Sequence, residues 1–253
     1  MSEMTPSAAY TFGAEGLAFT GALLAVHFVG VKVFGLSHLD AHFLPQLIAF
    51  CVTAALGAQA WFGAGMHSDL SLAWGVFTYS RAGDLIATLQ VGLQVYEVAC
   101  ACVERKLRGG SGEMLVHHAL ACLLAWLGCR YKVFLTYSVY YLGISELSSV
   151  PLAGVDFFKH RKPLAKKYPQ ATNACRQVFA ACFIVLRTLY WPYVSYFFWT
   201  VSLAALREGT PAPNIVRTFL AFNFVLTALQ LFWTGLIVQG VVKLLSAKPP
   251  KKD

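Results

Sequence analysis

Charged residues are scarce in this sequence. Asp, Glu, Lys and Arg make up 13% of its 253 residues, about half the share in an ordinary soluble domain. This scarcity excludes a disordered chain. The seven cysteines form no CxxC pair, so neither a zinc ribbon, a redox motif nor a small disulfide scaffold is indicated. A phosphate-binding loop, a dinucleotide fingerprint, a Gly-x-Ser-x-Gly elbow and an Asn-x-Ser/Thr acceptor are also missing.

Apolar residues dominate instead, at 57% of the chain. A helix needs about 20 apolar residues to cross a hydrocarbon core about 30 Å thick, and seven segments have about that length or more. We therefore predict an all-α polytopic membrane protein with about seven transmembrane helices. The first segment is too long for a cleavable signal core and is expected to remain as an anchor. The predicted spans are 14–36, 43–64, 83–103, 113–130, 132–152, 172–203 and 214–245.

The basic residues predict the orientation of these spans, because cytosolic loops collect Lys and Arg. With the N-terminus lumenal and the C-terminus cytosolic, thirteen basic residues face the cytosol and four face away. A net charge of +8 therefore reflects loop placement, and no nucleic-acid partner is expected. The cytosolic set is Lys32, Arg105, Lys106, Arg108, Lys159, Arg161, Lys162, Lys166, Lys167, Lys243, Lys248, Lys251 and Lys252; the opposite set is Arg81, Arg130, Lys132 and Arg207.

Several ionisable residues lie inside the predicted spans, where they are costly and are functional candidates by default. Five of them, from four helices, fall within about 6–10 Å of the same membrane face. An antiparallel hairpin centred near residue 131 places His117 opposite Glu146, and a carboxylate near an imidazole favours general-base chemistry. Structural alternatives are an interhelical hydrogen bond for His117 or His118 and an ion pair for Glu97 or Arg176. The five residues are Glu97, His117, His118, Glu146 and Arg176.

Three further features have weaker interpretations. Arg187 lies deeper than the five, where Glu146 or a lipid headgroup could be its partner. The His38-Leu-Asp-Ala-His42 segment has metal-like spacing, but no cysteine is near it in sequence and no metal is predicted. The basic run formed by Lys159, Arg161, Lys162, Lys166 and Lys167 is expected to be a topology signal, or a surface for anionic lipid or the phosphates of a CoA thioester.

Several motifs resemble the TLC-domain family, which includes the ceramide synthases and the translocating-chain-associating membrane proteins. The specific part is the pair His117-His118 in one span with Glu146 in the next; weaker matches are Tyr79-Ser-Arg-Ala-Gly-Asp84 and Arg187-Thr-Leu-Tyr-Trp-Pro192. The resemblance covers about residues 43–245. It implies six helices around a lipid-accessible central cavity, with one additional helix before them.

The sequence departs from the ceramide synthases at two positions. Their paired histidines are followed in the next helix by a His-Asp-x-x-Asp pattern, and Ser145 and Ser148 stand where those aspartates would be. Glu146 is one residue away, about 100° around a helix. The sequence is more similar to the smaller TLC-domain-containing proteins linked to membrane lipid composition.

These observations predict an endoplasmic-reticulum membrane protein of lipid homeostasis, related to sphingolipids, that binds or regulates fatty-acyl lipids. It would use no cofactor, contact membrane lipids and form a homodimer. The alternative is an acyltransferase with acyl-CoA as co-substrate and His117 or His118 as base; a proton-coupled carrier is third, because no inverted repeat is visible. The predicted regions are 1–42 (lumenal N-terminus and first helix), 43–245 (six-helix domain) and 246–253 (basic cytosolic tail).

Overall fold

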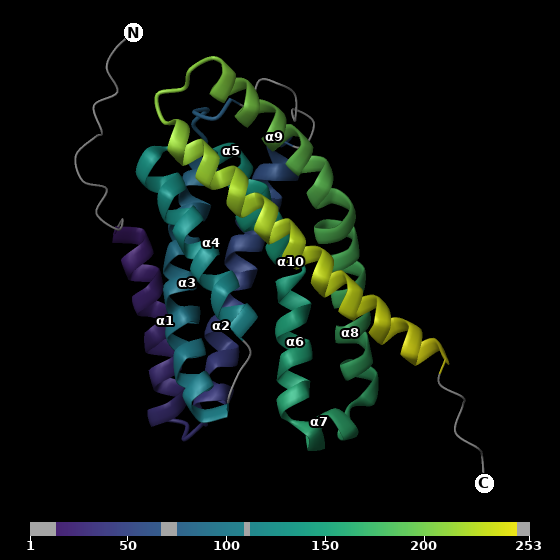
Figure 1. Cartoon of the computed structure of the whole chain (residues 1–253). Coiled ribbons are helices and arrows are strands. Elements are labelled where there is room, and N and C mark those ends of the chain that lie inside the picture. Colours follow the sequence, from purple (N-terminus) through teal and green to yellow (C-terminus); the bar gives the residue numbers. More distant parts are fainter. Residues whose placement is uncertain (1–13, 67–74, 109–111, 247–253) are drawn as a thin grey trace.

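The computed structural model describes residues 14–66, 75–108 and 112–246 (Figure 1). All of the regular elements within these ranges are helices, and no strand occurs among them. Lys248, Lys251 and Lys252 of the predicted tail lie outside the described residues, as do the side chains of Arg105, Lys106 and Arg108.

Six helices are long and apolar enough to cross a membrane, which confirms the all-α polytopic fold. Each corresponds to one predicted span. The six are Ala14–Lys32, His38–Gly63, Arg81–Cys102, Met114–Tyr131, Pro169–Arg207 and Pro213–Lys243. In the labels of Figure 1 they are formed by α1 (Ala14–Lys32), α2 (His38–Ala58) with η1 (Gln59–Gly63), α3 (Arg81–Arg108), α4 (Gly112–Tyr131), α8 (Pro169–Phe183) with η5 (Ile184–Tyr190) and α9 (Trp191–Arg207), and α10 (Pro213–Ser246).

The remaining predicted span, 132–152, is present as an irregular pass rather than one continuous helix. It consists of α5 (Leu135–Ser138), the π-helical η3 (Val139–Gly143), the 3₁₀-helical η4 (Ile144–Leu147) and α6 (Ser149–His160). Serine hydroxyls bond to the backbone here: Oγ of Ser145 donates to the Tyr141 carbonyl at 2.6 Å, and Oγ of Ser148 donates to the Ser145 carbonyl at 2.8 Å. Such bonds compete with the regular helix ladder. The pass nevertheless runs from the α9 end of the molecule to the short helix α7 (Lys162–Lys167) at the other end (Figure 1).

A close crossing with α2 fixes this irregular pass. A Cβ added to Gly57 would lie 2.6 Å from the carbonyl carbon of Gly143, so the two backbones are in direct contact. Small residues permit such approach between membrane helices. The crossing holds Ile144–Leu147, which contains Glu146, against α2.

The turn that precedes α5 is held by α3. Lys132 and Phe134 adopt left-handed backbone angles, with φ of 51° and 57°. Nζ of Lys132 lies 2.6 Å from Oδ2 of Asp84, and the N–H of Phe134 donates to the Val76 carbonyl at 2.8 Å. Asp84, a residue of the resemblance motif, therefore anchors a turn.

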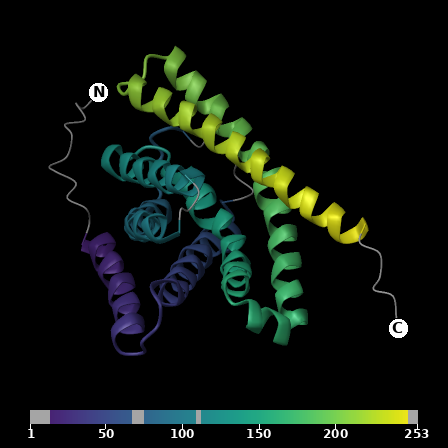
Figure 2. The ribbon, with the colours of Figure 1, turned by 60° about the horizontal axis from the view of Figure 1, so that its bottom comes forward.

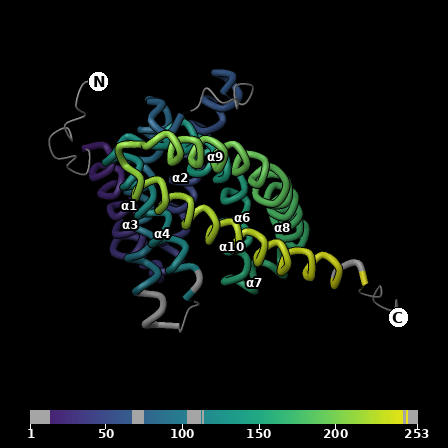
Figure 3. The backbone as a smooth tube through the Cα atoms, turned by 45° about the horizontal axis from the view of Figure 1, so that its top comes forward, coloured from purple at the N-terminus to yellow at the C-terminus, as the bar shows by residue number. Residues whose placement is uncertain are grey.

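The helices enclose the centre of the molecule from several sides. Helix α1 packs on α2 and α3 at the edge, and α10 crosses diagonally beside α9 and η5 (Figures 1 and 2). Figure 3 shows the same crossing of α10 from another side. The apolar core near α9 contains large aromatic side chains, among them Trp61, Phe134, Tyr140, Trp191 and Phe198.

Candidate functional site

A cavity of about 490 Å³ lies between the helices. This volume is within the range of about 300–1,000 Å³ that is typical of small-molecule sites. Its lining comes from α2, α3, α4, η4 with α6, α8 with η5, and α10, and no described residue of α1 contributes. The prediction of six helical passes around a central cavity, with one helix outside them, is confirmed.

A second, smaller chamber of about 70 Å³ adjoins the first and is mostly apolar. Its wall includes Leu124, Phe134, Tyr137, Phe198 and Phe219. Four residues line both spaces: Gln94, His117, Glu146 and Arg187. We call these four residues the dividing layer.

Arg187 organises the irregular pass. Its guanidinium donates from Nε to Oγ of Ser148 at 2.8 Å, and from Nη2 to the Ser145 carbonyl at 3.0 Å and to Oγ of Ser149 at 3.1 Å. Nη2 also lies 3.9 Å from Oε2 of Glu146. Arg187 belongs to the π-helical η5, and π turns commonly occur at functional sites. Ser145 and Ser148 thus form hydrogen bonds with Arg187 and with the backbone of their own segment.

His117 and His118 have different surroundings. His118 is buried and its Nδ1 donates to Oε1 of Gln94 at 2.7 Å. The buried Nδ1 of His117 has no hydrogen-bond partner within the described part of the chain. The His117 ring lies edge-on to Trp233, with ring centroids 5.2 Å apart. Both histidines line the large cavity, but only His117 belongs to the dividing layer.

Glu97 connects two histidines rather than pairing with Arg176. Its Oε2 lies 3.3 Å from Nε2 of His42 and 3.9 Å from Nε2 of His118. Glu97 is 4% exposed, so the carboxylate depends on these neighbours. Arg176 is exposed on α8 and does not line the cavity. The depth argument gave no direction for its side chain.

The comparison with known proteins gives the family. A family model described as a TLC domain matches residues 44–239. The chain belongs to the TLC-domain family. No curated protein and no solved structure matches it. A TLC domain indicates a protein connected with membrane lipids, and the several apolar helices make this member an integral multi-pass membrane protein.

Only part of the basic run predicted from the sequence reaches the TLC-domain cavity. Lys159 is exposed and lines the cavity together with Arg161. Arg161 forms an ion pair with Asp40, and its guanidinium lies over the Phe157 ring, 3.9 Å from the centroid. Arg161 therefore joins α6 to the start of α2. The other three residues, Lys162, Lys166 and Lys167, are exposed on α7 and are not part of the lining.

Sequence reasoning missed several residues of this cavity. Gln94 and Ala101 recur with the predicted residue Glu97 at the three- and four-residue spacing of one helix face, and all three line the cavity. The same spacing joins His42 to Gln46 on α2. Polar residues at helical spacing inside an apolar span were the signal that could have identified them. Trp233 of α10 also lines the cavity.

Proposed function

We propose that this TLC-domain protein binds a fatty-acyl lipid in the large cavity and thereby regulates membrane lipid composition. The acyl chain would follow the apolar wall, and the polar part of the lipid would meet the dividing layer. The observation that carries this proposal is the continuity of an apolar wall and a buried polar layer within one cavity. The wall includes Phe43, Phe50, Phe179, Phe183, Leu236 and Ile237.

The dividing layer would determine which lipid is selected. An acyl chain in a bilayer is already in an apolar solvent, so its transfer into the cavity gains little hydrophobic free energy. Selectivity must then come from the polar contacts, which are stronger where water is excluded. The layer combines the imidazole of His117, the carboxylate of Glu146 and the amide of Gln94 beside Arg187. This mixture of donors and acceptors suits an amide, amine or hydroxyl headgroup, as in a sphingolipid.

A photoactivatable fatty-acyl lipid tests this placement in reconstituted membranes. We expect labelled peptides from the cavity side of α8 and α10, at Phe183 and Trp233, and competition by an excess of unlabelled lipid. The exposed residues Phe224 and Leu231 of α10 provide the control, because contact with bulk lipid labels them without saturation. Labelling confined to these exposed residues would contradict the proposal.

A second candidate function is acyl transfer from acyl-CoA, favoured by the position of the His117 imidazole at the walls of both the large cavity and the smaller chamber. His117 would accept the proton of an acceptor amine or hydroxyl as that atom bonds to the acyl carbon. The thioester bond breaks, and the CoA thiolate leaves and takes up a proton. Lys159 at the cavity wall would contact the CoA phosphates. Against this candidate, the two positions of the synthase aspartates are serines that hold Arg187 and the backbone.

Labelled acyl-CoA with a panel of sphingoid bases separates the two functions. A binder retains lipid and forms no product, whereas a transferase forms product in the wild type and loses it in His117→Ala. A general base contributes about 10²–10⁴ in rate.

The cellular placement is also part of the proposal. Alternating basic loops favour a lumenal N-terminus and a cytosolic C-terminus, with the α7 end of the molecule on the cytosolic side. We also propose that the protein resides in the endoplasmic reticulum and forms a homodimer.

A further inference from the structure

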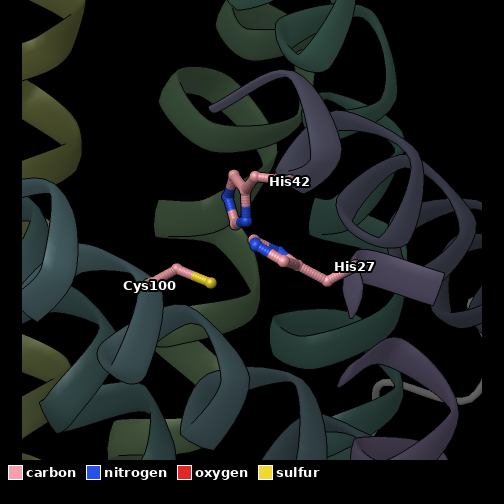
Figure 4. Close-up of side chains that lie close together, drawn as sticks. All are labelled: His27, His42 and Cys100. Atoms are coloured by element: carbon pink, nitrogen blue, oxygen red, sulfur yellow. The ribbon is translucent and has the colours of Figure 1, made fainter. Parts of the chain in front are cut away.

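A cluster of metal-ligand side chains lies at the junction of α1, α2 and α3. His27, His42 and Cys100 each contribute one potential ligand atom, and these atoms lie within 4.8 Å of one another (Figure 4). Each residue comes from a different helix. We propose that these three residues bind a transition-metal ion, Zn²⁺ being the best fit to two imidazoles and one thiolate.

The ring nitrogens are arranged as in a metal site. Nε2 of His42 lies 3.3 Å from a carboxylate oxygen of Glu97, and Nε2 of His27 lies 3.2 Å from Nδ1 of His38. A metal-binding histidine usually donates its second N–H to such an outer partner, which orients the ring. The Nδ1 atoms of both rings are thus directed to the same place, each 2.9 Å from the hydroxyl of Tyr96.

The ligand set selects the class of ion. Cys100 contacts His42, and a thiol with two imidazoles binds soft or borderline ions rather than Mg²⁺ or Ca²⁺. When Zn²⁺ binds, the thiol proton of Cys100 passes to solvent and a Zn–S bond forms. The fourth position of a tetrahedral site would be taken by water or by the Tyr96 hydroxyl.

The position of the cluster suggests what the metal does. His27 and His42 precede residue 44, where the family match begins, whereas Cys100 lies within the matched residues. The metal would join α1 to the TLC domain. Glu97 extends from His42 toward His118, so the metal would also stiffen one wall of the lipid cavity. At the predicted cytosolic end, the thiol would remain reduced.

Metal binding to the purified full-length protein tests the proposal. We expect one Zn²⁺ per chain by elemental analysis, and a thiolate-to-cobalt charge-transfer band when Co²⁺ replaces it. Cys100→Ser should abolish that band. Cys100→Ser and His27→Ala should each weaken Zn²⁺ binding by more than the roughly 10–100-fold that follows loss of an outer partner. Cys102→Ser, at an exposed cysteine two residues away, should change neither measurement.

A metal-free hydrogen-bond chain through Tyr96 is the alternative. It predicts no stoichiometric metal, no charge-transfer band, and a Zn²⁺ affinity that Cys100→Ser leaves unchanged; any one of these results would overturn the proposal. Protection of Cys100, but not Cys102, from alkylation by added Zn²⁺ would support it. His27 and Cys100 do not line the lipid cavity, so a wild-type protein that holds lipid but no Zn²⁺ would overturn the metal proposal and leave the proposed function standing.

Discussion

Nε of Arg187 donates a 2.8 Å hydrogen bond to Oγ of Ser148, the residue that stands where a ceramide synthase has an aspartate. The bond joins the π-helical turn of η5 to the point where the fifth pass changes from a 3₁₀ helix to an α-helix. Arg187 therefore shapes the cavity wall as well as lining it.

Arg187→Gln should destabilise the protein strongly. The substitution leaves Glu146 without its buried cation, a loss of roughly 3–5 kcal/mol in comparable pairs. Arg176→Gln is the matched control, since that arginine is exposed on α8 and should change stability by less than about 0.5 kcal/mol. Thermal unfolding in detergent measures both. Equal Tm values for the two variants would show that the Arg187 contacts are not formed.

The two adjacent histidines should respond differently to alanine substitution. His118→Ala leaves the buried Oε1 of Gln94 without its donor, while Nε2 of Gln94 still donates to Gln90, and should cost about 1–3 kcal/mol. His117→Ala breaks no protein hydrogen bond of Nδ1 and should change stability less, while lowering lipid occupancy or acyl transfer. Thermal unfolding and lipid quantification on the same samples separate the two roles. A larger loss of lipid in His118→Ala at equal stability would reverse the assignment.

Gly57→Ala should disturb the crossing that places Glu146. The new methyl group would be 2.6 Å from the Gly143 backbone, and overpacking of this kind costs about 1–3 kcal/mol. Gly21→Ala in α1 meets nothing within 4 Å and serves as the control. The prediction fails if both variants unfold at the wild-type temperature.

The sequence predicted the passes well and the site only in part. The length of apolar runs located six continuous helices, because a hydrocarbon core imposes that length whatever the packing. The break in the fifth pass was not predicted, since it depends on Gly143 meeting Gly57 and on serine bonds to the backbone. The prediction from depth along the membrane grouped Glu97, His118 and Glu146, and all three line one cavity. Depth gives no rotation about a helix axis, which is why Arg176 was placed beside them and His42 was missed.

Glycosylation acceptors introduced into the loops test the orientation. Sites near the N-terminus and near Arg207 should be modified, whereas a site near Lys162 should not, because thirteen basic residues are assigned to the cytosol against four opposite. Modification near Lys162 would show that the orientation is the opposite one. The proposed metal site would then lie on the oxidising side of the membrane.

Native mass spectrometry of the wild type and of Leu152→Trp is the most direct test of lipid binding in the cavity. Leu152 lines the cavity, and an indole there would occupy the space proposed for the acyl chain. Leu231→Trp adds the same ring on the exposed face of α10, where Leu231 is 56% exposed. We predict one co-purified acyl lipid per chain in the wild type and in Leu231→Trp, and little or none in Leu152→Trp at unchanged stability. Equal lipid occupancy in all three proteins, or no lipid in any of them, would contradict the account.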